Sequence, residues 1–231
     1  MWTFSDRREA GRRLGEALVP YAPSDVIVLG LPRGGVPVAY EVARRLAAPL
    51  DICIVRKLGV PGHEELAMGA IASGGVELVN LRMVRQLGLS TQDVARVVER
   101  EQQELERRER AYRDGRPAVD LRGRSVIVVD DGLATGASMQ AAVMALRRRQ
   151  PRAIVAAVPV APAETCDDLG RIADECVCLH TPENFLGVGQ WYARFDQTDD
   201  EEVRVLLAEA CAQRKMPLGI RARAGATLRA S

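Results

Sequence analysis

The chain has 231 residues, which is enough for one sizeable α/β domain or for two small ones. Its 32 Lys and Arg residues nearly balance 31 Asp and Glu residues, and the formal net charge of +1 excludes an overall field that attracts nucleic acid or membranes. The charged N-terminus has no apolar signal region, and no run approaches the ~20 apolar residues of a membrane span, so we expect a cytoplasmic protein. Five cysteines, an odd number, fit reduced thiols better than disulfides.

Continuous apolar runs rich in Val and Ile predict strands that are buried on both faces. Most of these runs are separated by segments with helical patterning. The runs lie at residues 25–30, 49–57, 125–131, 153–160 and 175–180. Strands of this kind are typical of a mainly parallel sheet with covering helices. We therefore expect an α/β fold.

The first helix expected after a strand has Pro37 in its first turn and ends before Pro49. Residues 67–80 predict a hairpin or an excursion around a glycine pair, Gly74 and Gly75.

A long charged helix is expected to open at Ser90, with Asp93 in the capping-box position. A thin apolar stripe recurs along it, at Val94, Val98, Leu105 and Tyr112. The rest of this helix is most simply a solvated face with pairs between adjacent turns, and a dimer contact through the stripe is the alternative.

The strand expected at 175–180 carries Cys176, Cys178 and His180 on one face, since side chains alternate along a strand. This trio could suggest metal ligation. Small residues on a half-buried strand are the better interpretation, because the sequence offers no second ligand cluster.

An acid pair, Asp130 and Asp131, follows the buried run at 125–129 and begins the stretch DDGLATGAS. In an open α/β sheet the carboxyl end of a strand faces the ligand crevice. The two glycines of the stretch allow tight backbone geometry, and Thr135 and Ser138 place hydroxyls beside the free amides of the next helix. Such a helix start attracts phosphate, whereas the acids are natural partners for sugar hydroxyls. A sugar phosphate would satisfy both the helix start and the acid pair.

The common nucleotide fingerprints do not apply to this chain. It has no GxxxxGK[ST] loop and no GxGxxG after its first strand. For the acid pair alone, a strand that ends in a charged turn remains the plain structural alternative.

The acid pair and its turn resemble the phosphoribosyl-pyrophosphate (PRPP) signature of the type I phosphoribosyltransferases, D-[DE]-x-x-x-T-G-x-T. The resemblance implies that Asp130 and Asp131 hold the ribose 2′ and 3′ hydroxyls. It also implies that the turn wraps the 5′-phosphate of PRPP. That turn consists of Ala134, Thr135, Gly136, Ala137 and Ser138, where Ser138 replaces the usual Thr and keeps its hydroxyl.

Two further stretches resemble loops of the same family. GLPRGGVPVA, after the first strand, is similar to the pyrophosphate loop, so Arg33, Gly34 and Gly35 are expected against the diphosphate, with a cis peptide from Arg33 to Gly34. VRKLGVPGHEELAMG is similar to the mobile catalytic loop, with Arg56 and Lys57 as its basic pair. Taken alone, the first stretch is an ordinary turn and the second is surface charge.

The resemblance implies transfer of the phosphoribosyl group from PRPP to a nitrogen acceptor, a nucleobase, as pyrophosphate leaves with Mg²⁺. Arg33 and Lys57 are the candidate catalytic residues, and Mg²⁺ is expected to arrive with PRPP, without assigned protein ligands. Ala134 stands where some purine-using relatives carry a carboxylate, which argues against hypoxanthine or guanine as the acceptor and leaves its identity open.

A hood over the acceptor is expected at residues 181–197, where Phe185, Trp191 and Tyr192 could stack on a base. Aromatic residues that merely cover the sheet edge are an equal alternative. The stretches DRREAGRRL and VGQWYARFDQTDDEEV extend the resemblance to a group of bacterial predicted phosphoribosyltransferases, but they add no chemistry.

We expect one domain over residues 1–213, with a core at about 20–180, the long helix inserted at 90–114 and a loose basic tail at 214–231. A homodimer is the expected assembly, and a nucleic-acid partner is disfavoured. The alternative function is a regulator that senses PRPP or a nucleotide with little catalysis, and RNA is one candidate partner for it. Arg33 and Lys57 favour the enzyme, because a sensor has less need of cations on a departing diphosphate.

Overall fold

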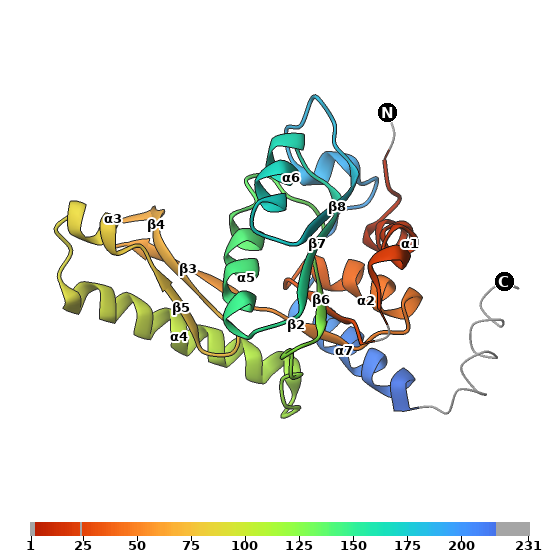
Figure 1. Ribbon diagram of the computed structural model, residues 1–231, viewed down its shortest axis with the longest axis horizontal. Helices are drawn as coiled ribbons and strands as arrows, with labels where there is room; N and C mark the ends of the chain where they lie inside the picture. Colours follow the sequence, from red (N-terminus) through yellow and green to blue (C-terminus); the bar gives the residue numbers. More distant parts are fainter. Residues whose placement is uncertain (1–2, 24, 216–231) are drawn as a thin grey trace, which may run out of the picture.

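A five-stranded parallel sheet forms the centre of the protein in the computed structural model, which describes residues 3–23 and 25–215 (Figure 1). Its strands run in the order β2-β1-β6-β7-β8, and all neighbouring pairs are parallel. The strands are β1 (Ile27–Gly30), β2 (Leu50–Ile52), β6 (Ser125–Val129), β7 (Ala153–Val160) and β8 (Glu175–His180). The expected α/β fold is confirmed.

Helices cover both faces of this sheet (Figure 1). α1 (Arg7–Ala17) and α2 (Gly35–Arg45) pack on the face that holds Val28 and Ile127. α5 (Ala137–Arg148) and α6 (Ala163–Gly170) pack on the opposite face, against Ile27 and Val126. Alternate residues of one strand thus enter two cores. Burial of each Val or Ile side chain stabilises the folded state by about 1.5–3 kcal/mol.

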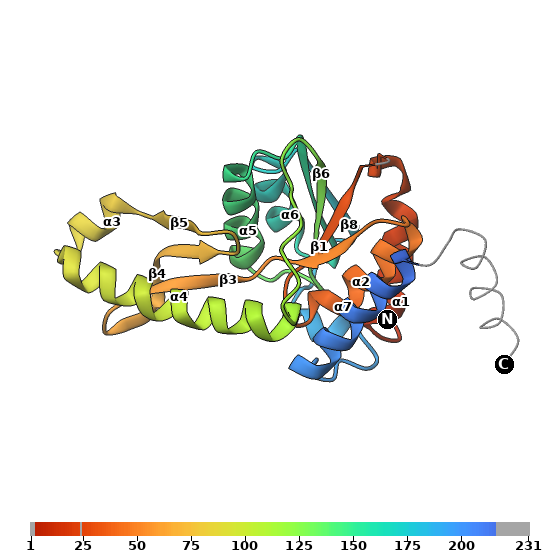
Figure 2. The same cartoon turned by 90° about the horizontal axis from the view of Figure 1, so that it is seen from below.

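The run expected at 49–57 breaks after β2 and enters a second sheet. This antiparallel sheet has the order β3-β4-β5 and consists of β3 (Val55–Val60), β4 (His63–Ala72) and β5 (Val76–Val79). With α3 (Leu81–Gln86) and α4 (Thr91–Arg113) it forms an arm that projects to one side of the core (Figures 1 and 2). The expected hairpin around Gly74 and Gly75 is confirmed as the β4–β5 connection, where both glycines have positive φ.

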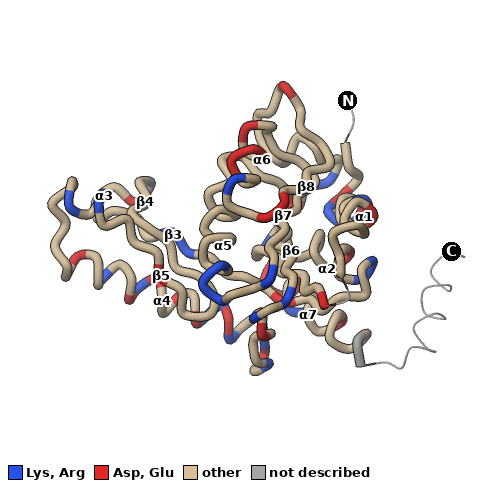
Figure 3. The backbone as a smooth tube through the Cα atoms, in the orientation of Figure 1, with Lys and Arg blue, Asp and Glu red and all other residues tan. Residues whose placement is uncertain are grey.

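The capping box at the start of α4 is confirmed, because Ser90 and Asp93 exchange hydrogen bonds there. Its apolar stripe packs within the chain, where Leu105 and Tyr112 are buried against β3 and against α7 (Asp200–Lys215). Acidic and basic residues are mixed along its remaining surface (Figure 3), as expected for a solvated face. The homodimer stays a prediction, and half of the stripe offered for its contact is already buried, while Val94 and Val98 are partly exposed.

α7 continues to Lys215, so the first two residues of the expected tail are helical, and the remainder of the tail lies outside the described residues. No helix in the described part of the chain is long and apolar enough to cross a membrane.

Candidate functional site

The topological switch point of the sheet lies between β1 and β6. From β1 the chain passes through α2 to β2 at one edge, and from β6 it passes through α5 to β7 on the other side. These two helices lie on opposite faces of the sheet. Loops that leave adjacent strands in opposite directions open a crevice at the carboxyl ends of those strands. The residues after β1 and β6 are the glycine pair and the acid pair.

The glycine pair lies directly against the acid pair. A Cβ atom on Gly34 would overlap with the Asp131 carboxylate, 2.8 Å from its Cγ. A Cβ atom on Gly35 would lie 2.7 Å from the Val129 carbonyl oxygen and 2.9 Å from Oδ1 of Asp130. Such approaches are closer than real side chains tolerate. A side chain at residue 35 would overlap with backbone atoms, and one at residue 34 would displace the Asp131 carboxylate.

The predicted cis peptide is displaced by one bond. The structure has it between Pro32 and Arg33, and the predicted bond from Arg33 to Gly34 is not cis. The Leu31 amide, just before this peptide, donates to the Val129 carbonyl at 2.9 Å and extends the pairing of β1 with β6. The Arg33 side chain is half exposed, and its guanidinium lies 3.7 Å from the Asp200 carboxylate at the start of α7.

The two acids share one backbone turn, in which the Asp131 amide donates to Oδ1 of Asp130 at 2.9 Å. Burial and the adjacent Asp131 charge raise the pKa of Asp130 well above its ordinary range. Burial also raises the pKa of Asp131, but Arg7 opposes this rise through an ion pair of 2.8 Å from Nε to Oδ2. The site therefore holds two carboxylates whose ionisation is costly without a cationic or hydrogen-bonding partner.

The turn after the acids leads into α5 and is open to solvent. Ala134, Thr135, Ala137 and Ser138 are exposed, whereas Gly136 is buried as the N-cap of α5 with a φ of 71°. Gly136 has no side chain to cap this helix start, and the Ala137 amide donates only a long bond of 3.4 Å to the Thr135 hydroxyl. Its first amides and the positive end of its dipole suit a phosphate group.

α6 packs against this turn through Thr165. The Thr165 hydroxyl donates to the Ala134 carbonyl at 2.9 Å. Its methyl group Cγ2 lies 2.8 Å from the position that a Cβ atom on Gly136 would take. Thr165 is buried, so it fixes the turn without being part of the exposed surface.

Arg56 and Lys57 lie in the arm, on β3. The segment expected as a mobile loop is a β-hairpin, in which β3 pairs with β4 across a tight turn, and its mobility stays a prediction. Arg56 donates to the buried Glu101 of α4 at 2.6 Å and 2.9 Å. Lys57 is exposed on a strand that leaves the core shortly after β2, and the structure does not bring it into contact with the acid pair.

Two of the three predicted hood aromatics are in the interior. Trp191 and Tyr192 are 5% and 6% exposed, and they pack with Phe4 at the β8 side of the sheet. The Tyr192 hydroxyl donates to the Asp131 carbonyl oxygen. Phe185 is partly buried against the same cluster. This placement leaves Trp191 and Tyr192 no open face for a base, and it favours the alternative in which the aromatics cover the sheet edge.

The contacts of Arg7 and Thr165 with the site were not predicted from the sequence. Arg7 is one of four arginines in the stretch DRREAGRRL, and no local signal separates it from the other three. Thr165 lies in a short helix with an ordinary composition. Only the tertiary packing of α1 and α6 against the strand ends identifies these two residues.

The trio on β8 is confirmed to alternate along one strand, but its members contact different neighbours. The thiols of Cys176 and Cys178 interact with Cys166 of α6, and the His180 ring lies 4.8 Å from the Trp191 ring. Within residues 3–23 and 25–215, no group of three or more His, Cys, Asp or Glu side chains could hold a metal ion.

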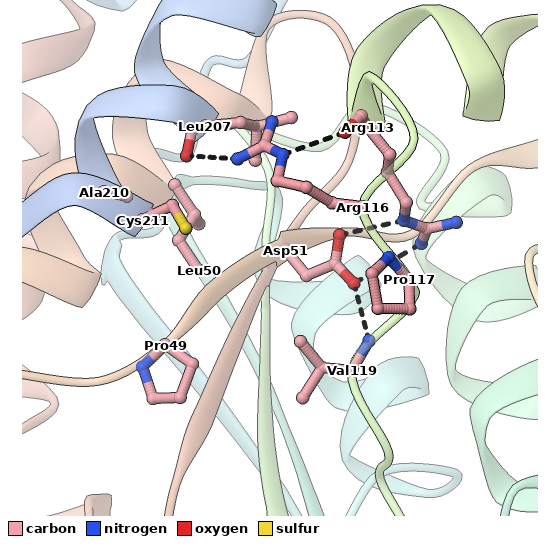
Figure 4. Close-up of a pocket in the computed structure, with 10 residues that line it drawn as sticks. All are labelled: Pro49, Leu50, Asp51, Arg113, Arg116, Pro117, Val119, Leu207, Ala210 and Cys211. Carbon is pink, nitrogen blue, oxygen red and sulfur yellow. Dashed lines mark hydrogen bonds and ion pairs between the residues drawn. The ribbon is translucent and has the colours of Figure 1, made fainter. Parts of the chain in front are cut away.

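A cavity of about 420 Å³ lies apart from the acid pair, between β2, the end of α4 and α7 (Figure 4). Its charged groups are satisfied by other protein groups. Arg113 pairs with Asp51 at 3.1 Å and with Glu109 at 2.7 Å. Arg116 donates to three backbone carbonyl oxygens of neighbouring segments, at 2.8 Å, 2.9 Å and 3.3 Å. This cavity therefore offers a ligand no free charged group among the described residues that line it, and the strand-end crevice remains the better candidate.

The sequence profile of the phosphoribosyl transferase domain matches residues 62–193, which is more than half of the chain and includes the acid pair and its turn. This chain belongs to the phosphoribosyl transferase family. The resemblance seen in its motifs is thereby confirmed.

Two relatives of this phosphoribosyl transferase family member support the assignment. A protein of Mycobacterium tuberculosis, provisionally named a phosphoribosyl transferase, is 46% identical over 210 residues, which cover 91% of this chain and 47% of the relative. This chain thus spans about half the length of the curated relatives that it matches. The crystal structure of TT1426 from Thermus thermophilus is 44% identical, with a TM-score of 0.80, and the match covers 90% of this chain and 98% of TT1426.

Proposed function

We propose that this protein transfers the 5-phosphoribosyl group of PRPP to a nitrogen acceptor and releases pyrophosphate. The observation that carries the proposal is the contact between Gly34 and Asp131. It joins a loop suited to a diphosphate and an acid pair suited to ribose hydroxyls in one crevice, at the switch point of the sheet. The exposed start of α5 lies directly after the acid pair, where the 5′-phosphate of the same ligand belongs.

Each part of PRPP has a proposed partner in this arrangement. Asp130 and Asp131 accept hydrogen bonds from the ribose 2′ and 3′ hydroxyls, and the turn at residues 134–138 surrounds the 5′-phosphate. Backbone groups of Gly34 and Gly35 approach the diphosphate, because no side chain separates them from it. A ligand that is held at three points keeps its C1 atom in a fixed position for the acceptor.

The transfer builds positive charge near C1 and negative charge on the leaving diphosphate, so cations aimed at the diphosphate accelerate it. Arg33 supplies one such cation, since its half-exposed side chain begins in the diphosphate loop and lies at the long distance of 3.7 Å from the Asp200 carboxylate. Lys57 supplies a second if the β3–β4 hairpin bends toward the crevice. Closure of that hairpin would also exclude water, which competes with the acceptor.

Mg²⁺ is the metal that this family generally uses. It binds proteins through one or two carboxylates together with substrate phosphates, and it seldom needs a cage of protein ligands. The ion would therefore arrive with the phosphates of PRPP, and no residue of the chain is assigned to it. When bound with PRPP, Mg²⁺ would neutralise charge on the diphosphate.

The proposed acceptor is a nucleobase that does not require a carboxylate at residue 134. Ala134 is exposed in the turn and cannot accept a proton from the base. Trp191 and Tyr192 are buried and do not supply a stacking surface. The missing carboxylate at residue 134 also fits a second candidate function, a PRPP-binding regulator without turnover.

Pyrophosphate release separates the two candidates. The protein is incubated with PRPP, Mg²⁺ and each of a panel of nucleobases, and pyrophosphate is measured. We expect release that needs both PRPP and one base and that is lost in Asp131→Asn. Asp25→Asn is the matched control, because Asp25 pairs with Arg152 just before β1, at the amino ends of the strands and so far from the acid pair at their carboxyl ends. Saturable PRPP binding without release for any base would support the regulator, and equal release by both variants would contradict the proposed site.

A further inference from the structure

Arg7 is held on three sides at the edge of the acid pair. Its Nε lies 2.8 Å from Oδ2 of Asp131, and its NH1 donates to the Asp196 carbonyl oxygen at 2.5 Å. Its guanidinium lies over the Phe195 ring, 3.9 Å from the centroid. Only 12% of its side chain is exposed. These contacts connect the first turn of α1 to the strand end that carries Asp131.

The backbone around Arg7 is joined to the segment that carries Phe195. The Phe4 amide donates to the Trp191 carbonyl at 2.8 Å, and the Ala193 amide donates to the Phe4 carbonyl at 2.7 Å. Arg194 extends this connection through an ion pair of 2.7 Å with Asp6, the N-cap of α1. The start of α1 is therefore joined to residues 191–196. Arg7 lies on one of these connected segments, and its contacts Phe195 and Asp196 lie on the other.

We propose that Arg7 is a positioning residue for the ribose subsite: it holds Asp131 by Oδ2 and leaves Oδ1 to accept a ribose hydroxyl. The inference rests on the proposed function. Oδ2 is enclosed by the guanidinium of Arg7 and by the backbone of Gly34, which would overlap with it if Gly34 had a Cβ atom. One orientation of the carboxylate satisfies both neighbours, so the subsite is formed before the ligand arrives.

The three contacts argue against a mobile Arg7 that competes with the ligand. A competitor would have to leave Asp131 when ribose binds, which would cost the stacking on Phe195 and the bond to the Asp196 carbonyl as well. The neighbouring arginines make other contacts. Arg8 lies 5.7 Å from the Tyr40 ring, and Arg12 lies 3.9 Å from Glu41, so Arg7 is the arginine of this group that the structure directs to the acids.

Arg7 also affects the charge of the subsite. The groups that face Asp131 are Asp130 with a like charge, Arg7 with the opposite charge and the Tyr192 hydroxyl on its backbone carbonyl. Without Arg7, burial would raise the pKa of Asp131 further, because no cation would oppose it. As the pH is lowered, the carboxyl would then take up a proton at a higher pH than in the wild type. Ligand binding would begin to weaken at that higher pH.

The test measures the affinity for ribose 5-phosphate by calorimetry between pH 5 and pH 8 in Arg7→Met, Arg7→Lys and the control Arg12→Met. Arg12 lies on the same helix, and its side chain is about half exposed. We expect Arg7→Met to bind about 10- to 100-fold more weakly at neutral pH, from the value of a hydrogen bond to a charged group. Its affinity should also begin to fall at a higher pH than in the wild type. Arg7→Lys should lose less affinity and show a smaller shift of the pH profile than Arg7→Met. The control should match the wild type.

Two outcomes separate this inference from the function on which it rests. A wild-type protein that binds neither ribose 5-phosphate nor PRPP would contradict the proposed function. A wild-type protein that binds, together with an Arg7→Met variant that matches Arg12→Met in affinity and pH profile, would contradict the role of Arg7 alone.

Thermal unfolding shows whether Arg7→Met is folded. If it is not, Phe195→Leu makes the same test, because it removes the ring beneath the guanidinium and leaves Arg7 in place. We expect weaker binding and the same direction of change in the pH profile. Unchanged affinity and an unchanged profile in a folded Phe195→Leu variant would overturn the inference.

Discussion

Gly34 and Asp131 are in such close contact that no side chain fits between them: a Cβ atom on Gly34 would lie 2.8 Å from Cγ of the acid. Gly34→Ala must therefore displace the Asp131 carboxylate or the loop that carries Gly34. We expect a loss of about 1–3 kcal/mol in the free energy of unfolding and much weaker PRPP binding. Gly170→Ala is the control, because nothing lies within 4 Å of the Cβ atom that it would add. Equal PRPP affinity in the two variants would contradict the close approach.

The acid pair should cost stability at neutral pH. The raised pKa of Asp130 means that the folded state binds a proton more tightly than the unfolded chain does. Its stabilising contribution is therefore complete below the ordinary pKa of 3.8 and is lost as the pH rises through the raised value. We expect Asp130→Asn to increase the free energy of unfolding at pH 7 by on the order of 1 kcal/mol and to weaken PRPP binding. Denaturant titration at pH 7 and pH 4 checks the sign, since the gain should shrink at the lower pH.

The pattern of buried residues could be predicted because both faces of a parallel strand are apolar. Val28 and Ile127 enter one core and Ile27 and Val126 the other, so the runs are continuous in sequence. The same continuity hides the break between β2 and β3, since Cys53 and Ile54 remain buried where the chain changes sheets.

The parts of the site that depend on tertiary packing could not be predicted. Arg7 resembles the arginines beside it until α1 is placed against the strand ends. Trp191 and Tyr192 have the composition of a binding loop, but contacts with Phe4 bury them. The acid pair and its turn were recognisable because their chemistry lies within one short stretch of chain.

Thr165 should support the phosphate turn without touching the ligand. Thr165→Val keeps the methyl group beside Gly136 and removes the hydrogen bond to the Ala134 carbonyl. The loss of about 1 kcal/mol corresponds to roughly five-fold weaker binding, and it should be equal for PRPP and ribose 5-phosphate because both carry the 5′-phosphate. Thr91→Val, at the exposed start of α4, is the control. A larger loss for PRPP than for ribose 5-phosphate would show that Thr165 acts on another part of the site.

Arg33 should act on the diphosphate and not on the ribose. Arg33→Ala is expected to weaken PRPP binding by about 10-fold or more, from the loss of a charge-assisted hydrogen bond. The affinity for ribose 5-phosphate, which lacks the diphosphate, should be nearly unchanged. Arg45→Ala is the matched control, since Arg45 pairs with Glu16 at the other end of α2. If both ligands weaken equally, the effect of Arg33 is on the fold of the loop and not on the diphosphate.

Calorimetric titration with PRPP and Mg²⁺, on the wild-type protein and on Asp131→Asn, tests the central claim most directly. The account predicts saturable binding to the wild type and its loss in Asp131→Asn, with both proteins shown to be folded by thermal unfolding. Absence of binding to the folded wild type, or equal binding to both proteins, would contradict a PRPP site at the ends of β1 and β6.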